Sequence, residues 1–255
     1  MAGRSYTVNN IEWPSVTTVL GLLDKGEALL QWGVNCALSY VREHALTEDW
    51  ETVLLMAKGN WREARDEAAD IGKEIHELIK VYIRHGRDAL GSYRPEVENG
   101  FLAFLQWESE NGVEWLEAEK QVFDGVHGYA GTLDAKCRFT KGAFIGRVFV
   151  IDFKSSKGFY DGYAEQVAAY RHADSLSTSI AADGCGILRL DKETGVPEFK
   201  DTSETYEQKL TFFLKLVDCY YSQKNRRLKG NPFILGAKAA AEKATLAELK
   251  ARKAA

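Results

Sequence analysis

The chain has 255 residues, of which 45% are hydrophobic and 27% are charged, and its formal net charge is −4. This is an ordinary globular composition, and the length suffices for one large domain with a full hydrophobic core. The negative balance excludes the whole-chain basic signature of a tight, sequence-independent DNA-binding protein, although a local basic groove is compatible with it.

The first 112 residues have helical periodicity. Apolar spacing predicts a helix over 15–46 that breaks around residues 25–26, with Ser15 as a possible cap and Pro14 near its first turn. Helices continue over 49–83, and the second of them is predicted to start near Asn60 and to carry His76 beside a buried face. Another helix is expected over 95–109.

The rest of the chain alternates strands and helices. The expected elements are strands over 114–123, 131–139 and 146–154, a helix over 161–176, strands over 182–190 and 198–200, and a helix over 202–227. We therefore predict an α/β fold, a mixed central sheet flanked by helices, with an N-terminal helical part at 1–112 and a core at 113–235. Residues 236–255, rich in Ala, Lys and Glu, are expected to fray or to be disordered.

Two strands carry the charges that suggest chemistry. Alternation on strand 131–139 places Asp134 on one face with Thr132 and Lys136. The opposite face would hold Leu133, Ala135, Cys137 and Phe139. On the next strand Asp152 and Lys154 share a face, so that pairing of the strands would bring together two carboxylates and a lysine.

Carboxylate oxygens are hard ligands that suit Mg²⁺ or Mn²⁺, and a neighbouring lysine can orient water or neutralise phosphate charge. Taken alone, an Asp-x-Lys on a strand is more typical of a solvated face. Gln166 and Tyr170 stand four residues apart on the helix predicted over 161–176, so they share a face and can reach one site. A tyrosine there is also a common core residue.

Together, Gly131-x-x-Asp134, Asp152-x-Lys154 and Gln166-x-x-x-Tyr170 resemble the PD-(D/E)XK nuclease superfamily, and within it the RecB-type exonuclease branch. Gly72-x-x-x-His76 is similar to the upstream histidine motif of that branch. The resemblance covers roughly residues 60–175 and implies a restriction-endonuclease-like core. It implies a Mg²⁺- or Mn²⁺-dependent deoxyribonuclease, most typically an exonuclease.

The resemblance also assigns roles. His76, Asp134, Asp152 and the backbone carbonyl of Phe153 would be metal ligands, and Lys154 would serve the hydrolytic water. Gln166 and Tyr170 would hold the DNA strand or the active-site residues. Glu119 matches a strand acid that the family often has at this place, with Glu117 as a close competitor.

Several further expectations concern ligands and partners. The candidate groove charges for DNA are Lys136, Arg138, Lys157 and Arg171, each of which is by itself an ordinary surface residue. The basic cluster at 224–229 would either contact DNA phosphate or simply suit a helix C-terminus. Some RecB-type nucleases hold an iron–sulfur cluster through one early cysteine and a later trio. The dispersed Cys36, Cys137, Cys185 and Cys219 include no such trio and no C-x-x-C pair, so we expect neither that cluster, nor a zinc site, nor disulfides.

The segment 13–20, followed by Leu30-Gln-Trp32, looks like the leader of phage-encoded members, although a helix start explains it equally. A bacterial or phage-infected cytoplasm is expected, because unpaired cysteines suit a reducing compartment and neither a signal peptide nor a membrane span is apparent. The partners would be DNA, as single strands or duplex ends, and a single-strand annealing or replication protein. The alternatives are a structure-specific endonuclease and a nucleic-acid-binding protein without hydrolysis.

Overall fold

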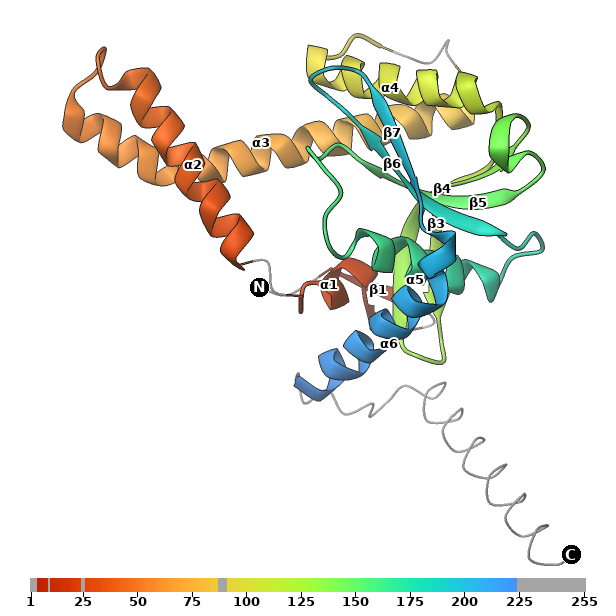
Figure 1. Cartoon of the computed structure of the whole chain (residues 1–255). Coiled ribbons are helices and arrows are strands. Elements are labelled where there is room, and N and C mark those ends of the chain that lie inside the picture. The colour runs from red at the N-terminus through yellow and green to blue at the C-terminus, as the bar shows by residue number, and fades with distance from the viewer. Residues whose placement is uncertain (1–3, 9, 24–25, 87–90, 224–255) are drawn as a thin grey trace, which may run out of the picture.

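A computed structural model describes residues 4–8, 10–23, 26–86 and 91–223. The predicted α/β fold is confirmed: a five-stranded mixed sheet has the order β3-β4-β5-β6-β7 and is covered by helices on both faces (Figure 1). The strands are β3 (Val113–Asp124), β4 (Tyr129–Phe139), β5 (Val148–Lys154), β6 (Gly184–Leu190) and β7 (Pro197–Asp201). The β5 and β6 strands run parallel, and the other neighbours are antiparallel.

Helices α3 (Trp50–His85) and α4 (Pro95–Asn111) cover one face of this sheet. Ile71, Ile75 and Leu78 recur at helical spacing along α3, and they pack in one core with Phe104 of α4 and Phe153 of β5. Burial of each such side chain contributes about 1.5–3 kcal/mol. The C-terminal half of α3 is therefore held firmly against the strands that carry the candidate site.

The opposite face is covered by α1 (Val16–Leu20), α5 (Tyr163–Ser175) and α6 (Tyr206–Gln223), which is preceded by the short 3-10 helix η3 (Ser203–Thr205). Another 3-10 helix, η2 (Gly142–Phe144), lies in the β4–β5 connection where a turn was predicted. The helix predicted over 202–227 thus starts with a 3-10 turn. Its basic end at 224–229 and the tail at 236–255 lie outside the described residues.

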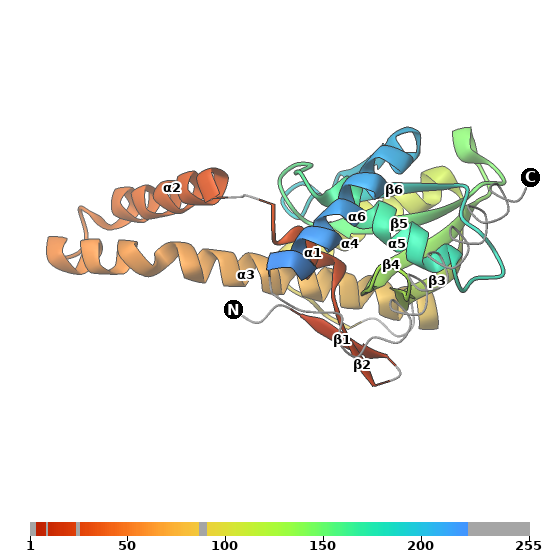
Figure 2. The same ribbon diagram turned by 90° about the horizontal axis from the view of Figure 1, so that it is seen from below.

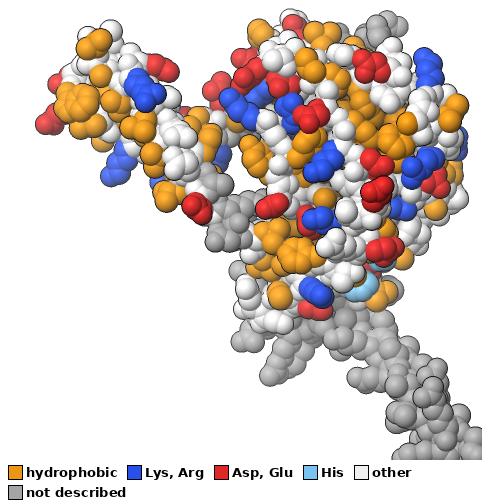
Figure 3. All heavy atoms as spheres, viewed as in Figure 1, with side chains coloured by type: hydrophobic (Ala, Val, Ile, Leu, Met, Phe, Trp, Pro, Cys, Tyr) orange, Lys and Arg blue, Asp and Glu red, His pale blue; other side chains and the backbone are white. Residues whose placement is uncertain are grey.

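Helix α2 (Gly26–His44) and the first half of α3 form an arm that projects from the body (Figures 1 and 2). The predicted start of a separate helix near Asn60 is wrong, since α3 is continuous through this point. The Asn60 side chain instead donates a hydrogen bond to the Cys36 carbonyl and ties α3 to α2. Hydrophobic side chains lie over the surface of the arm (Figure 3). The side chains of Leu30 and Leu55, on α2 and α3, are exposed.

The N-terminus contains a hairpin that the sequence analysis missed, formed by β1 (Ser5–Val8) and β2 (Ile11–Pro14). Pro14 ends β2 and directly precedes the Ser15 cap, so it lies near the first turn of α1, as predicted, but belongs to a strand. The predicted cap is confirmed, because Ser15 Oγ accepts a hydrogen bond from the Thr18 N–H at 2.9 Å. No helix within the described residues is long and apolar enough to cross a membrane.

Candidate active site

The candidate site lies where the β3–β4 ribbon rotates. Glu117 pairs with Lys136, Ala118 with Ala135, and Lys120 with Leu133, so Glu119 lies opposite Asp134. Among the described non-glycine residues, only Asn10 and Glu119 have positive φ, and φ of Glu119 is 51°. This left-handed conformation is costly for a residue with a Cβ and often marks functional sites.

The rotation changes which face the side chains meet. Four residues of β4 were predicted to share one face. Three of them do, and pack under α3 and α4: Ala135, Cys137 and Phe139. The fourth, Leu133, packs on the opposite face with α5. The predicted shared face of Asp134 and Lys136 is also wrong. Asp134 approaches α3, whereas Lys136 approaches α5. Strict alternation fails where the β3–β4 pairing is irregular: Glu119 has a left-handed backbone, and the register shifts between Trp115 and Glu117.

The Asp134 carboxylate fills the point at which β4 and β5 separate. The β4–β5 pairing ends at Ala135 and Ile151, and beyond it the Phe153 N–H donates to Asp134 Oδ2 at 2.7 Å. The Asp134 carboxylate thus accepts the hydrogen bond that a backbone carbonyl of β4 would accept if the two strands remained paired. This fixes one carboxylate oxygen and places the Phe153 backbone, the predicted carbonyl ligand, beside the Asp134 side chain.

His76 reaches the same place from α3. Its Nδ1 lies 3.5 Å from Asp134 Oδ1, and its ring packs edge-on against Phe153 with centroids 5.9 Å apart. One ligand atom each from His76, Glu119 and Asp134 lie within 4.8 Å of one another. Of the two competing acids, Glu119 joins this group, whereas Glu117 is ion-paired with Lys120.

Asp152 stands beside this group with both oxygens engaged. Its Oδ2 lies 2.5 Å from Lys154 Nζ, and its Oδ1 accepts a hydrogen bond from Gln166 Nε2 at 2.9 Å. Gln166 Nε2 is also 3.2 Å from the Tyr170 hydroxyl. The structure thus brings together all four side chains singled out on β5 and α5, with Asp152 at their centre.

Electrostatics differ between the two buried aspartates. Burial raises the pKa of Asp152 to about 6, because desolvation outweighs the attraction of Lys154. Burial acts in the same direction on Asp134, but His76, Lys154 and the Phe153 N–H together hold the pKa of that carboxyl below its usual range. Desolvation opposes the charged form of His76, yet the charge of Asp134 raises the pKa of His76. Burial also raises the pKa of Glu119.

Two motif glycines allow close approach. A Cβ at Gly131 would overlap the Tyr170 ring, and a Cβ at Gly72 would lie 3.0 Å from Ser155 Oγ. The first glycine lets α5 approach β4, and the second lets α3 approach the end of β5. Close packing thus explains the small residue in the Gly-x-x-Asp and Gly-x-x-x-His patterns.

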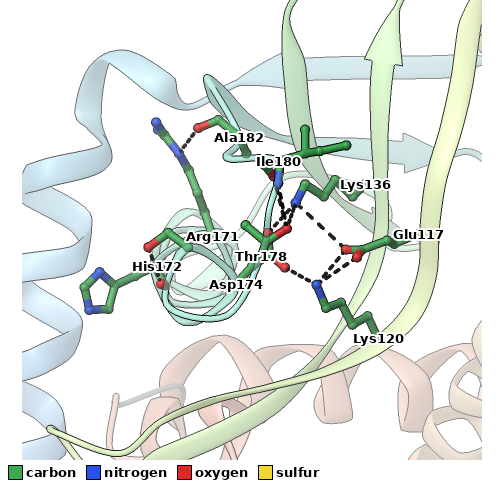
Figure 4. Close-up of polar contacts among 10 residues, drawn as sticks. Glu117, Lys120, Lys136, Arg171, His172, Asp174, Thr178, Ile180 and Ala182 are labelled. Carbon is green, nitrogen blue, oxygen red and sulfur yellow. Dashed lines mark hydrogen bonds and ion pairs between the residues drawn. The ribbon is translucent and has the colours of Figure 1, made fainter.

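Lys136 is not a groove residue, contrary to the prediction. Its side chain is 1% exposed, and its ammonium lies 2.7 Å from Asp174 Oδ2 and 2.8 Å from Thr178 Oγ1 (Figure 4). Asp174 is also paired with Lys120 at 2.7 Å. These contacts fasten α5 to β3 and β4, and they withdraw Lys136 from any phosphate in solvent.

The other predicted DNA contacts are spread apart. Arg138 pairs with Glu114 across the strands at 2.8 Å, about 13 Å along β4 from Asp134. Arg171 donates to the Ala182 carbonyl and stacks on Tyr206. Lys157, 79% exposed, follows β5 and pairs with Glu193 at 3.0 Å. Of the four, Lys157 combines exposure with proximity in sequence to the site.

Sequence reasoning missed Tyr163, whose ring lies 4.8 Å from Lys154 Nζ. This cation–π contact and the Asp152 ion pair hold the ammonium from two sides. The position of Tyr163 at the start of α5, three residues before Gln166, was an available signal, because residues three and four apart share a helix face.

The donor set fits a hard divalent cation. Two carboxylates and one imidazole converge, and adjacent ligands of an octahedral Mg²⁺ ion lie roughly 3.0 Å apart. The His76–Asp134 distance of 3.5 Å is close to that separation. No protein-family model matches this chain, and a search of curated proteins finds no significant relative.

Proposed function

We propose that this chain is a Mg²⁺- or Mn²⁺-dependent DNA nuclease that hydrolyses phosphodiester bonds. The observation that carries the proposal is the convergence of His76, Glu119 and Asp134 next to the ion pair of Asp152 and Lys154. These five residues come from one helix and three strands, and Glu119 has a left-handed backbone. Such an arrangement is more specific than an exposed acidic cluster.

His76, Glu119 and Asp134 would hold the cation, with Asp152 beside them as the third acid. The bound metal would supply Lewis acidity to a phosphate oxygen and lower the pKa of water. Lys154, held by Asp152 and Tyr163, would orient the attacking water or neutralise charge on the phosphate. Gln166 would fix the Asp152 carboxylate, and Tyr170 would fix Gln166.

Exonuclease action is the preferred mode, and this preference rests on the resemblance to the RecB-type branch. The same resemblance favours a role in phage-type recombination, repair or replication, with an annealing or replication protein as partner. A structure-specific endonuclease on the same fold is the second candidate. A non-hydrolytic DNA-binding protein is disfavoured, because the metal acids and the lysine of the motif are all in place.

Incubation of the protein with end-labelled linear DNA and with covalently closed circular DNA, each with Mg²⁺ or Mn²⁺, would test the metal-dependent hydrolysis and the exonuclease mode. We expect release of nucleotides from linear DNA, no cutting of circles, and loss of activity with EDTA. Asp134→Asn should reduce the rate by about 10³-fold, because it removes a charged ligand. Cutting of circles would overturn the exonuclease mode, and an unchanged rate in Asp134→Asn would overturn the site.

A further inference from the structure

A second group of potential ligands lies farther along β3, outside the candidate active site. It consists of Asp124, His127 and His172, whose ligand atoms lie within 4.8 Å of one another. Asp124 ends β3, His127 lies in the β3–β4 turn, and His172 is on α5. We propose that these three side chains bind one Zn²⁺ ion, independently of the proposed nuclease chemistry.

Asp124 is held in place for this purpose. Its side chain has no exposed surface, and its Oδ1 accepts hydrogen bonds from the N–H groups of Val126 and His127 at 2.8 and 3.0 Å. Oδ1 of Asp124 is thus used to hold the β3–β4 turn. These hydrogen bonds leave Oδ2 directed at the two imidazoles, at 2.6 Å from His127 Nδ1 and 3.2 Å from His172 Nε2.

The geometry is close to that of a tetrahedral site. Ligands about 2.1 Å from a zinc ion lie roughly 3.4 Å apart. The Asp124–His172 distance of 3.2 Å is near this separation, and the Asp124–His127 distance would have to widen by less than about 1 Å. The side chains of His127 and His172 are 39% and 23% exposed, so solvent has access for a fourth ligand.

The donor types select the ion. Two imidazole nitrogens and one carboxylate oxygen suit Zn²⁺, whereas Mg²⁺ prefers oxygen ligands and keeps several waters. The dispersed cysteines led us to expect no zinc site, and the proposal departs from that expectation because this group uses no cysteine. Asp218 of α6 adds negative charge near His127, which also favours a cation.

The surrounding contacts make the group rigid before an ion arrives. Tyr221 of α6 donates its hydroxyl hydrogen bond to the Gly128 carbonyl in the turn at 2.6 Å, and Tyr129 donates to the Ala169 carbonyl of α5 at 3.2 Å. His172 points to the side of α5 away from the Asp174 ion pairs (Figure 4). The ion would therefore cross-link the β3–β4 turn to the helix that carries Gln166 and Tyr170.

The test uses the full chain, freed of metal with a chelator, in a His76→Gln background that removes the imidazole of the other group. Zn²⁺ alone is titrated by calorimetry, and thermal unfolding is followed with and without it. We expect one equivalent to bind and the unfolding temperature to rise. A further His127→Gln or His172→Gln change should weaken binding by more than about 100-fold, since even outer-shell partners cost 10–100-fold.

His85→Gln, which changes an exposed histidine of α3, is the matched control and should leave Zn²⁺ binding unchanged. X-ray absorption of the Zn²⁺-loaded His76→Gln protein provides a measurement that does not depend on folding of the ligand variants, and two imidazoles should be found on the ion. The proposal is overturned if the His76→Gln protein binds no zinc. It is also overturned if folded His172→Gln binds as well as its parent, or if the absorption spectrum lacks the two imidazoles.

Discussion

Two histidine–carboxylate groups share strand β3, yet their donor atoms differ. Glu119 of the first and Asp124 of the second are five residues apart on β3. Helix α5 supplies His172 to the second group, whereas its Gln166 binds Asp152 beside the first. The first group has two carboxylates, one imidazole and a neighbouring ammonium from Lys154. The second has one carboxylate and two imidazoles at the surface.

The difference follows from the local backbone of β3, which determines which helix each carboxylate meets. At Glu119 the ribbon rotates, and the opposing Asp134 meets His76 on α3. At Asp124 the strand ends in a turn, so the carboxylate is anchored by backbone N–H groups and meets α5. The first geometry gathers two carboxylates and one imidazole, which would suit the proposed Mg²⁺ or Mn²⁺, and the second gathers one carboxylate and two imidazoles, which would suit the proposed Zn²⁺.

The largest expected effect is a loss of DNA hydrolysis that leaves Zn²⁺ binding intact. Lys154→Met should reduce the rate of DNA hydrolysis by about 10²–10⁴-fold, because the ammonium that orients water or neutralises phosphate is lost. Zn²⁺ binding at Asp124 should be unaffected. Lys157→Met, which changes an exposed lysine, should raise KM without lowering kcat. Steady-state kinetics on linear DNA would check both, and equal losses of kcat in the two variants would contradict the assignment.

A second change should weaken both groups together. Lys136→Met leaves the buried Asp174 with Lys120 as its remaining partner, and it should lower the free energy of unfolding by about 3 kcal/mol. Because Asp174 fastens α5, Zn²⁺ affinity and nuclease rate should both fall. Urea unfolding measures the stability. Arg138→Met on the same strand breaks an exposed pair and should cost less than about 1 kcal/mol, so equal costs would contradict the role of the buried pair.

Gly131→Ala should disturb the first group alone. The new methyl group meets the Tyr170 ring, so overpacking should cost about 1–3 kcal/mol and shift Tyr170 away from Gln166. The nuclease rate should fall while Zn²⁺ binding persists. Gly158→Ala is the control, since nothing lies within 4 Å of a Cβ at that position. A normal rate in Gly131→Ala would show that the Tyr170 position is unimportant.

The smallest effect is a pH dependence of stability without metal. Asp134 raises the pKa of His76. The ion pair therefore contributes its full stabilisation when the pH is below the ordinary pKa of histidine. This contribution falls as the pH rises through the raised pKa of His76. The pKa of Asp134 is lowered, so the same contribution is lost again as strong acid protonates that carboxyl. In EDTA, His76→Gln should lower the free energy of unfolding by less than about 1 kcal/mol near pH 6 and should not change it at alkaline pH. A cost that grows with pH would contradict the pair.

Local periodicity explains why much of the site was predictable. Gln166 and Tyr170 lie four apart on a helix, and they are hydrogen-bonded in the structure. Asp152 and Lys154 lie two apart on a strand, and they form an ion pair. The missed hairpin at 5–14 also had a signal, since Asn10 adopts φ of 61° and asparagine favours such turn positions.

Other features required the fold. Lys136 and Asp174 are 38 residues apart, and nothing in the alternation of β4 shows that a lysine there is buried against α5. The left-handed backbone of Glu119 has no signature in residue type, because glutamate rarely adopts this conformation. His127 and His172 are 45 residues apart in the chain, and only the packing of α5 on the β3–β4 turn brings them to one carboxylate.

By itself, the sequence determined the order of the helices and strands from residue 95 onward, the α/β class, and that Asp152 shares a face with Lys154 and Gln166 with Tyr170, because these depend on periods of two and of 3.6 residues. The tertiary structure alone decided which face Asp134 uses and that Lys136 is internal. Those outcomes depend on the rotation of one strand pair and on contacts between distant segments, which no local period encodes.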